Sequence, residues 1–260
     1  MIRPLKAVTH IQRLPEVFRC RAATKQWRQL SMAYIGLSSR FPFSIDLATG
    51  SFEFREISDV PTFWQIFFRD VYPVRPDYRL IIDAGANIGV FALYALLRAP
   101  DCHVIAVEPA PDSCERMRSL LLRHGVAHRC TIHQAALGGS FGVTTIQMSG
   151  GSQFRQTGIG QGVEVPLTTL DCLISPYERV DLLKIETEGA EYKALPSTRP
   201  EILRRVRHME MEFHPCGQPN ELFGWLGDCG FSLDAVREDG GGYGTATLSF
   251  HEKGLPLSAA

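Results

Sequence analysis

The stretch Arg79-Leu80-Ile81-Ile82-Asp83-Ala84-Gly85-Ala86-Asn87-Ile88-Gly89 decides the fold class. Its first half is a short apolar run that ends in an acid, which is typical of a buried parallel strand. Its second half is a glycine turn, and residues 88–97 are apolar nearly all round, as in a helix packed on a sheet. The order predicts a parallel α/β sheet with a ligand site at the turn.

The rest of the chain repeats this alternation. Further strands are predicted at 103–107, 130–136, 180–185 and 206–213, and helices begin near a capping box at Asp112 and near residue 221. Residues 231–236 and 245–250 are predicted to form an antiparallel hairpin joined through three glycines. We therefore expect a Rossmann-like α/β fold: a mostly parallel, doubly wound sheet that ends in an antiparallel hairpin.

Two segments lie outside this alternation. Residues 1–77 are predicted to form a helical and hairpin extension, with Val17, Phe18 and Leu30 buried, that packs on a main domain of residues 78–260. Between the third and fourth strands, two short strands are predicted around a glycine-rich loop at 149–162. That loop is interpreted either as a plain surface loop or as a lid beside the substrate.

Composition excludes several classes of protein. The 260 residues carry a formal net charge of −1, so no strong field favours nucleic acid. Residues 1–40 hold eight basic residues against Glu16, which fits a solvated helix or weak peripheral contact with a membrane surface. Seven scattered cysteines and no apolar run of about 18–20 residues predict a reduced, cytoplasmic protein.

The chemistry of the turn favours one cofactor over another. Gly85 and Gly89 permit a positive φ and a close approach to a ligand, and Ala86 lies between them. A dinucleotide turn needs glycine where this chain has Asn87. The Asp83 carboxylate would repel a pyrophosphate but attract a cation, by roughly 4 kcal/mol at an effective dielectric near 20. This difference predicts S-adenosylmethionine, which is cationic at sulfur and nitrogen, in place of NAD.

The end of the second strand supports the same site. Glu108 can accept hydrogen bonds from two ribose hydroxyls, and Pro109 follows it. This feature suits either cofactor, so a nicotinamide-dependent oxidoreductase stays the main alternative.

Lys184 and Glu186 are predicted to lie where the fourth strand ends, on one face of the sheet. Glu186 is a candidate general base, a hydrogen-bonding group for cofactor or substrate, or the partner of Lys184 in a structural ion pair. Lys184 could orient Glu186 or stabilise a developing alkoxide.

The fifth strand ends in further polar residues. Glu212 is a candidate substrate contact, and His214 is a candidate for proton transfer or a hydrogen-bonded structural residue. Glu188 is a second candidate substrate contact, whereas Glu191 is interpreted as a favourable charge at a helix start. The spacing of these groups matches no known metal signature, so no metal site is predicted.

These motifs together resemble the FkbM-type methyltransferases. The resemblance covers residues 55–215 and rests, in chain order, on Arg55-x-x-Ser58-Asp59, Tyr72, residues 83–89, Glu108-Pro109, residues 135–138, Thr169-Leu170-Asp171, and Lys184-Ile185-Glu186-Thr187-Glu188-Gly189-Ala190-Glu191. It implies a class I methyltransferase fold, transfer of a methyl group to a hydroxyl of a sugar, glycan or natural product, and adenine beside Gln134 and Ala135.

One position departs from the family. FkbM-type proteins usually have Asp where this chain has Glu186, so the carboxylate lies one methylene further out. A binding module without catalytic activity therefore stays a further alternative. The aromatic helix at 63–68 is interpreted as buried within the chain or as the face of a homodimer.

Overall fold

The computed structural model describes residues 14–38, 40–146 and 162–251. The chain divides into two compact units: residues 1–73 with 119–127, and residues 74–118 with 128–260. The predicted glycine-rich loop at 149–162 falls almost entirely outside the described residues, as do the first 13 residues of the predicted extension. The boundary at 77/78 stays a prediction.

The smaller unit is held by aromatic packing. It contains helices α1 (Leu14–Ala23) and α2 (Trp27–Tyr34), the hairpin β1 (Phe43–Leu47) and β2 (Gly50–Phe54), helix α3 (Asp59–Trp64) and the π-helix η3 (Gln65–Arg69). The rings of Phe52, Phe54 and Phe63 are buried and pack against one another. Burial within the unit therefore accounts for the aromatic helix, except for the half-buried Phe67.

One predicted core position in this unit is wrong. Phe18 is 66% exposed, whereas Cys20 of the same helix is fully buried. Successive helical residues are about 100° apart, so a residue two positions before Cys20 lies on nearly the opposite side of α1.

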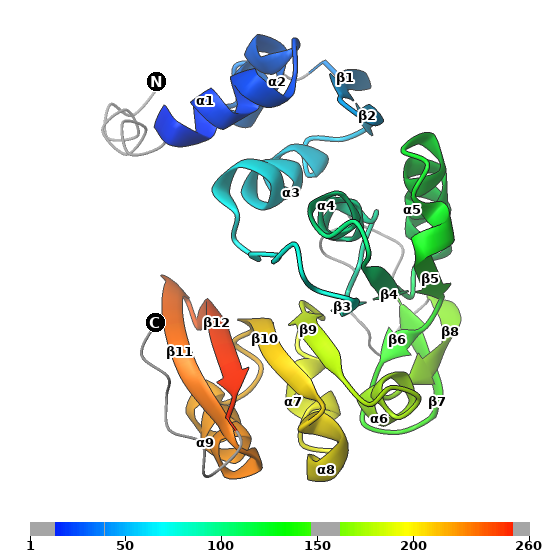
Figure 1. Cartoon of the computed structure of the whole chain (residues 1–260), viewed down its shortest axis with the longest axis vertical. Helices are drawn as coiled ribbons and strands as arrows, with labels where there is room; N and C mark the ends of the chain where they lie inside the picture. Colours follow the sequence, from blue (N-terminus) through cyan, green and yellow to red (C-terminus); the bar gives the residue numbers. More distant parts are fainter. Residues whose placement is uncertain (1–13, 39, 147–161, 252–260) are drawn as a thin grey trace. The chain divides into compact units, whose positions relative to one another are not determined.

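The larger unit contains a seven-stranded sheet in the order β11-β12-β10-β9-β3-β4-β5 (Figure 1). Its parallel strands are β3 (Leu80–Ala84), β4 (His103–Val107), β5 (Cys130–His133), β9 (Val180–Ile185) and β10 (Val206–Phe213). The hairpin of β11 (Phe231–Gly240) and β12 (Tyr243–Phe250) adds antiparallel to β10. This Rossmann-like arrangement is the one that the sequence predicted.

Helices pack on the sheet, and the two faces of the sheet carry different kinds of side chain. One face packs into an apolar core with α6 (Leu170–Ile174), α7 (Glu191–Ala194), α8 (Pro200–Leu203) and α9 (Pro219–Cys229). Helix α4 (Val90–Arg98) contacts β3 and β4. Ile82 and Leu183 belong to the apolar core, so the alternating residues Asp83 and Lys184 face the other way. The charged side chains of the sheet are thereby kept apart from that core.

The third strand is shorter than predicted. β5 pairs with β4 only as far as His133, and the chain then turns. Ala136 and Leu137 form β6, which joins β8 (Val163–Thr168) and β7 (Gly142–Ile146) in a separate three-stranded sheet. The predicted capping box is also displaced, because helix α5 (Pro111–Arg123) begins at Pro111 and Asp112 lies inside its first turn.

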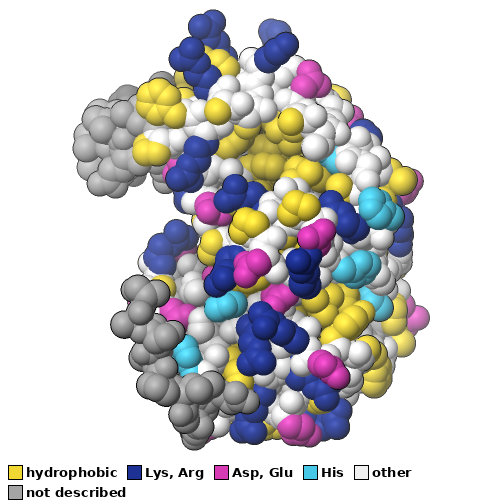
Figure 2. Space-filling model, viewed as in Figure 1, with side chains coloured by type: hydrophobic (Ala, Val, Ile, Leu, Met, Phe, Trp, Pro, Cys, Tyr) yellow, Lys and Arg dark blue, Asp and Glu magenta, His cyan; other side chains and the backbone are white. Residues whose placement is uncertain are grey.

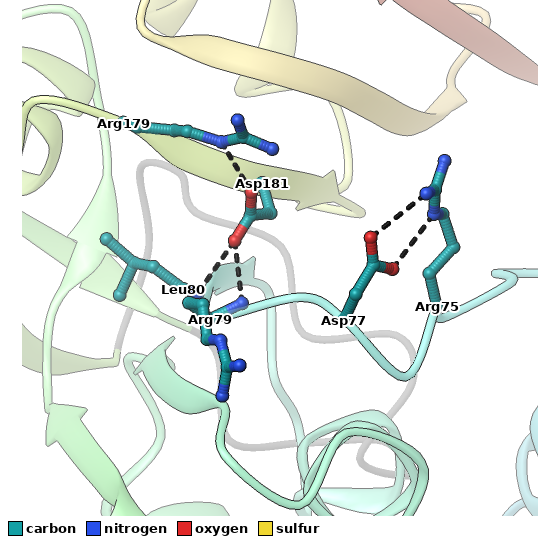
Figure 3. A network of polar contacts seen from close by, with 6 residues as sticks. All are labelled: Arg75, Asp77, Arg79, Leu80, Arg179 and Asp181. Carbon is teal, nitrogen blue, oxygen red and sulfur yellow. Dashed lines mark hydrogen bonds and ion pairs between the residues drawn. The ribbon is translucent and has the colours of Figure 1, made fainter.

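A polar network fixes the amino ends of β3 and β9 (Figure 3). The buried Asp181 carboxylate accepts hydrogen bonds from the backbone N–H groups of Arg79 (2.6 Å) and Leu80 (3.1 Å) and from Nε of Arg179 (2.7 Å). Three donors satisfy an acid that would otherwise be costly to bury. The register of the two central strands is thus tied at the edge opposite the candidate site.

The surface shows no continuous patch of one charge on the face in Figure 2: over the part of the view that holds the larger unit, Lys and Arg side chains are interspersed with Asp and Glu. No helix in the described residues is long and apolar enough to cross a membrane.

Candidate active site

The turn after β3 has the conformation that its glycines suggest. Gly85 (φ 81°), Asn87 (φ 49°) and Gly89 (φ 85°) all adopt left-handed backbone. The N–H groups of Gly85 and Ala86 donate to the carbonyl of Val107 at 2.9 and 3.0 Å, which joins the turn to the end of β4. Asn87 is the one residue of the three that bears the steric cost of a side chain in this region, a cost that Asn tolerates better than most residues.

The glycines are also required by packing. A Cβ on Gly85 would lie 1.8 Å from the carbonyl oxygen of Glu186, and one on Gly89 would lie 2.4 Å from Cγ of Met117. The sequence predicted that a ligand approaches these glycines closely. In the structure, the groups that approach them are Glu186 and Met117 of the same chain. Contact between these glycines and a cofactor stays a prediction.

Glu108 follows the end of β4 and is hydrogen-bonded to the glycine turn. Its buried carboxylate accepts the N–H of Asn87 through Oε2 (2.8 Å) and the N–H of Ala110 through Oε1 (2.9 Å). These two bonds fix the orientation of the carboxylate beside the turn.

The remaining predicted cofactor residues lie on the same edge. Pro109 follows β4, and Gln134 and Ala135 follow β5, its parallel neighbour. Gln134 is exposed and Ala135 is buried. Since parallel neighbours end at the same edge of a sheet, Glu108, Gln134 and Ala135 lie at one edge, and their contact with adenine and ribose stays a prediction.

Lys184 is the centre of a charged group at the ends of β3 and β9. Its ammonium lies 3.0 Å from Oδ1 of Asp83 and 3.2 Å from Oε2 of Glu186, and it donates to the carbonyl of Gly85 at 3.0 Å. The Phe91 ring lies 5.8 Å from the ammonium. Lys184 thus ties the glycine turn to the end of the fourth parallel strand.

Burial makes this ion pair unusual. The Asp83 side chain is completely buried and that of Lys184 is 3% exposed. Burial raises the pKa of Asp83, an effect that Lys184 opposes. Burial would lower the pKa of Lys184, but Asp83 and Glu186 together hold it above its usual value. The cation that Asp83 meets in this structure is therefore Lys184.

The turn offers one polar atom that fits a bound cofactor. Among the described residues, Oδ1 of Asn87 is buried without a hydrogen-bond partner. Buried polar atoms are rarely left unsatisfied, so such an atom beside Glu108 fits a ligand that carries hydroxyl or amine donors. S-adenosyl-L-methionine has both kinds of donor, on its ribose, its adenine and its amino-acid moiety.

Acidic side chains surround Glu186 on the reacting side. The charges of Glu186, His214, Lys184 and Glu188 all act on Glu212, whose pKa is raised to about 7, first by burial and then by Glu186. The pKa of Glu188 is also raised, again mainly by burial. The five predicted residues of the reacting side therefore form one electrostatic group at the ends of β9 and β10.

Sequence reasoning missed the part played by Glu191. Its carboxylate is completely buried and accepts Nδ1 of His214 at 2.8 Å. The sequence places its charge at a helix start, and it does begin α7. The two residues are 23 positions apart, and no local spacing signals their pairing.

A metal centre is not found in the described part of the chain. Among those residues, no group of three or more His, Cys, Asp or Glu side chains is arranged to hold a metal ion.

A family comparison decides the class of protein. The family described as the methyltransferase FkbM domain matches residues 83–233, more than half of the chain. The chain belongs to the FkbM methyltransferase family. Membership supports methyl transfer with S-adenosyl-L-methionine as the cofactor, and it disfavours the nicotinamide-dependent alternative.

Two curated relatives of this FkbM methyltransferase come from Sordaria araneosa and Streptomyces tacrolimicus. Methyltransferase sdnD of Sordaria araneosa is 26% identical over 67% of this chain and 83% of its own length. The 31-O-demethyl-FK506 methyltransferase FkbM of Streptomyces tacrolimicus is 27% identical over 61% of this chain and 75% of its own length.

Solved structures of methyltransferases are similar to this FkbM methyltransferase at low identity. One is a putative tRNA (m1A22) methyltransferase, Sp1610 of Streptococcus pneumoniae, in complex with S-adenosyl-L-methionine. It is 14% identical, with a TM-score of 0.44 over 72% of each chain.

The buried Glu210 of this FkbM methyltransferase gives a testable dependence of stability on pH. Burial raises its pKa to about 7, although Thr247 Oγ1 donates to it at 2.9 Å. The folded state then binds a proton more tightly than the unfolded state, so Glu210 lowers the free energy of unfolding as pH rises from about 4.5 to about 7. We expect Glu210→Gln to be more stable than the wild type at pH 8, by on the order of 2 kcal/mol.

Urea unfolding at pH 5 and pH 8 measures this difference. The gain from Glu210→Gln should shrink at pH 5, and the exposed Glu115→Gln should show little gain at either pH. An equal gain for Glu210→Gln at both values would contradict the assigned cause.

Proposed function

We propose that this chain is an S-adenosyl-L-methionine-dependent O-methyltransferase whose acceptor is a hydroxyl of a sugar, glycan or natural product. The observation that carries the proposal is the cluster of Lys184, Glu186, Glu188, Glu212 and His214 at the ends of β9 and β10. It lies beside the turn where ligands bind in sheets of this kind. The relative from Streptomyces tacrolimicus is named for a 31-O-demethyl acceptor, which is methylated on oxygen.

One group of residues would bind the cofactor and a second group would bind the acceptor. Gly85, Ala86, Asn87 and Gly89 of the turn, together with Glu108, Pro109, Gln134 and Ala135, would hold the cofactor, with Glu108 accepting from the ribose. Asp83 supports the turn through Lys184, which donates to Gly85. The cofactor supplies an electrophilic methyl group on its sulfonium.

Glu186 and Glu212 would receive the acceptor. The Glu186 side chain is 39% exposed, while Lys184 holds one of its oxygens at 3.2 Å. A carboxylate in this setting can accept a hydrogen bond from a hydroxyl and orient it, and positioning accounts for much of the catalysis of a displacement reaction. The longer Glu186 side chain places this contact one methylene nearer the acceptor than the usual Asp of the family.

The acidic surroundings also restrict the acceptor. Glu186, Glu188 and Glu212 disfavour phosphorylated or carboxylated compounds, because like charges repel at short range in a partly buried site. A neutral polyhydroxylated compound, whose hydroxyls donate to carboxylates, fits this group of acceptors.

Calorimetry and an acceptor screen test the proposal. We expect S-adenosyl-L-methionine and S-adenosylhomocysteine to bind and NAD not to bind. Glu108→Gln should weaken cofactor binding by about 10-fold or more, because charge-assisted hydrogen bonds to the ribose are lost. The exposed Glu115→Gln serves as the matched control and should bind as the wild type does.

The screen then measures release of S-adenosylhomocysteine with neutral sugars, glycans and hydroxylated macrocycles. Product with a new O-methyl group supports the proposal. Methylation on nitrogen alone, or binding of NAD alone, would overturn it. Cofactor binding without turnover of any acceptor would favour the alternative of a binding module without catalytic activity.

A further inference from the structure

His214 lies between two carboxylates just beyond the end of β10. Its Nδ1 is 2.8 Å from Oε1 of Glu191, and its Nε2 is 3.6 Å from Oε2 of Glu188. The first distance is that of a hydrogen bond and the second is too long for one. The two ring nitrogens therefore differ: Nδ1 is hydrogen-bonded to Glu191, whereas Nε2 is not hydrogen-bonded to Glu188.

Glu191 is fixed more firmly than a charge at a helix start requires. While Oε1 meets His214, Oε2 accepts the N–H of Gly189 (2.9 Å) and the hydroxyl of Thr187 (3.1 Å). A carboxylate that accepts on both oxygens needs a donor at Nδ1, so the neutral ring carries its proton there. The lone pair of Nε2 then points toward the Glu188 side.

The backbone around the ring is also constrained. The hydroxyl of Tyr192 donates to the carbonyl of His214 at 2.9 Å, and the Tyr243 ring packs edge-on at 5.7 Å. Glu188 adopts a left-handed backbone (φ 53°), which is strained for a residue that carries a side chain. Such conformations persist where the surrounding structure imposes them, often at functional sites.

We propose that Glu191 positions His214 so that Nε2 receives the proton of the methylated hydroxyl. This inference rests on the proposed O-methyltransferase function. As the hydroxyl oxygen forms its new bond to the methyl carbon, the bond from that carbon to the sulfonium sulfur would break, and its electron pair would go to sulfur. The O–H bond would break with its electron pair staying on oxygen, and the proton would join the Nε2 lone pair. The imidazolium that results is stabilised by Glu191 and faces Glu188.

The charges around the ring fit this role. Groups facing His214 come from α7 (Glu191), from the segment after β9 (Glu188) and from β10 (Glu212). Burial would lower the pKa of His214, but these three carboxylates raise it above its ordinary value. A proton acceptor with a pKa near the working pH is the most effective general base.

Nitrogen-15 NMR of the histidines in the full chain, with S-adenosylhomocysteine as the added probe, tests the inference without an acceptor. The His214 signals are assigned by their loss in His214→Gln. Above its pKa, wild-type His214 should be the Nδ1–H tautomer. Glu191→Gln should lower the pKa of His214 and mix the two tautomers, whereas Glu188→Gln should lower the pKa and keep the tautomer.

A wild-type ring protonated on Nε2 would overturn the inference, and this result does not depend on the folding of the Glu191 or Glu188 variants. Unchanged His214 signals in a folded Glu191→Gln would overturn it as well. Failure of the wild type to bind S-adenosyl-L-methionine would instead refute the proposed function and leave the tautomer result standing.

Kinetics with the acceptor found in the screen complete the test. We expect kcat to fall about 100-fold in His214→Gln and about 10-fold in Glu191→Gln, with the cofactor KM nearly unchanged. The acidic limb of the pH profile should move to lower pH in Glu191→Gln. An unmoved limb would show that Glu191 has only a structural role.

Discussion

Replacing Lys184 with methionine is expected to lower the free energy of unfolding by about 3–5 kcal/mol at pH 7. The change leaves Asp83 completely buried without its cation, and the remaining charge must be protonated or stay uncompensated. In the variant the folded pKa of Asp83 lies further above its unfolded value, so the loss should grow as pH rises and shrink toward pH 4. Urea unfolding at several pH values measures it.

A double-mutant cycle identifies the cause. Asp83→Asn with Lys184→Met removes both charges, and the pair should recover part of the loss, because a neutral pair needs no compensation. The matched control is Arg199→Met, which breaks an exposed ion pair of similar length (3.1 Å to Asp171) and should cost under about 1 kcal/mol. A double variant less stable than the sum of the single changes would refute the ion-pair argument.

Gly85→Ala is expected to lower the free energy of unfolding by about 2–5 kcal/mol and to weaken binding of S-adenosyl-L-methionine. The new methyl group would meet the backbone carbonyl of Glu186, and a left-handed φ adds strain of its own. Either the turn or the end of β9 must move, and both belong to the candidate site. Thermal unfolding and calorimetry measure the two effects.

The control for Gly85→Ala is a glycine at which an added methyl group would contact no other atom. Gly224 lies exposed within α9, and a Cβ there would meet nothing within 4 Å. Gly224→Ala should therefore raise stability by up to about 1 kcal/mol, because alanine is the better helix former. Equal losses for the two substitutions would show that the carbonyl contact at Gly85 has no special cost.

The sequence predicted the central strands well because their apolar runs end at polar residues. The strands at 103–107, 180–185 and 206–213 are confirmed at both ends. The third strand was predicted too long, because apolar residues resume at Ala135 and lead into β6, although the hydrogen bonds of β5 to β4 stop at His133. The local sequence pattern indicates which residues are apolar, but it does not indicate with which strand a segment will pair.

The site shows the same limit. Lys184 and Glu186 could be placed on one face from strand alternation alone, and they do share a face. The partner of Asp83 could not be predicted this way, since Lys184 is about 100 residues later and is brought near by the pairing of β3 with β9. The contact of Glu191 with His214 likewise depends on how β9 and β10 end side by side.

The Asp181 network has a consequence for synthesis on the ribosome. The central strand β3 can pair with β4 as soon as about 25 further residues have emerged, but its other neighbour, and the acid that holds its first residues, follow about 100 positions later. Contacts between distant segments form slowly, and unpaired strand edges invite aggregation. A nascent chain that stalls before residue 181 would thus expose one edge of β3, which makes this interval the one in which a chaperone would matter most.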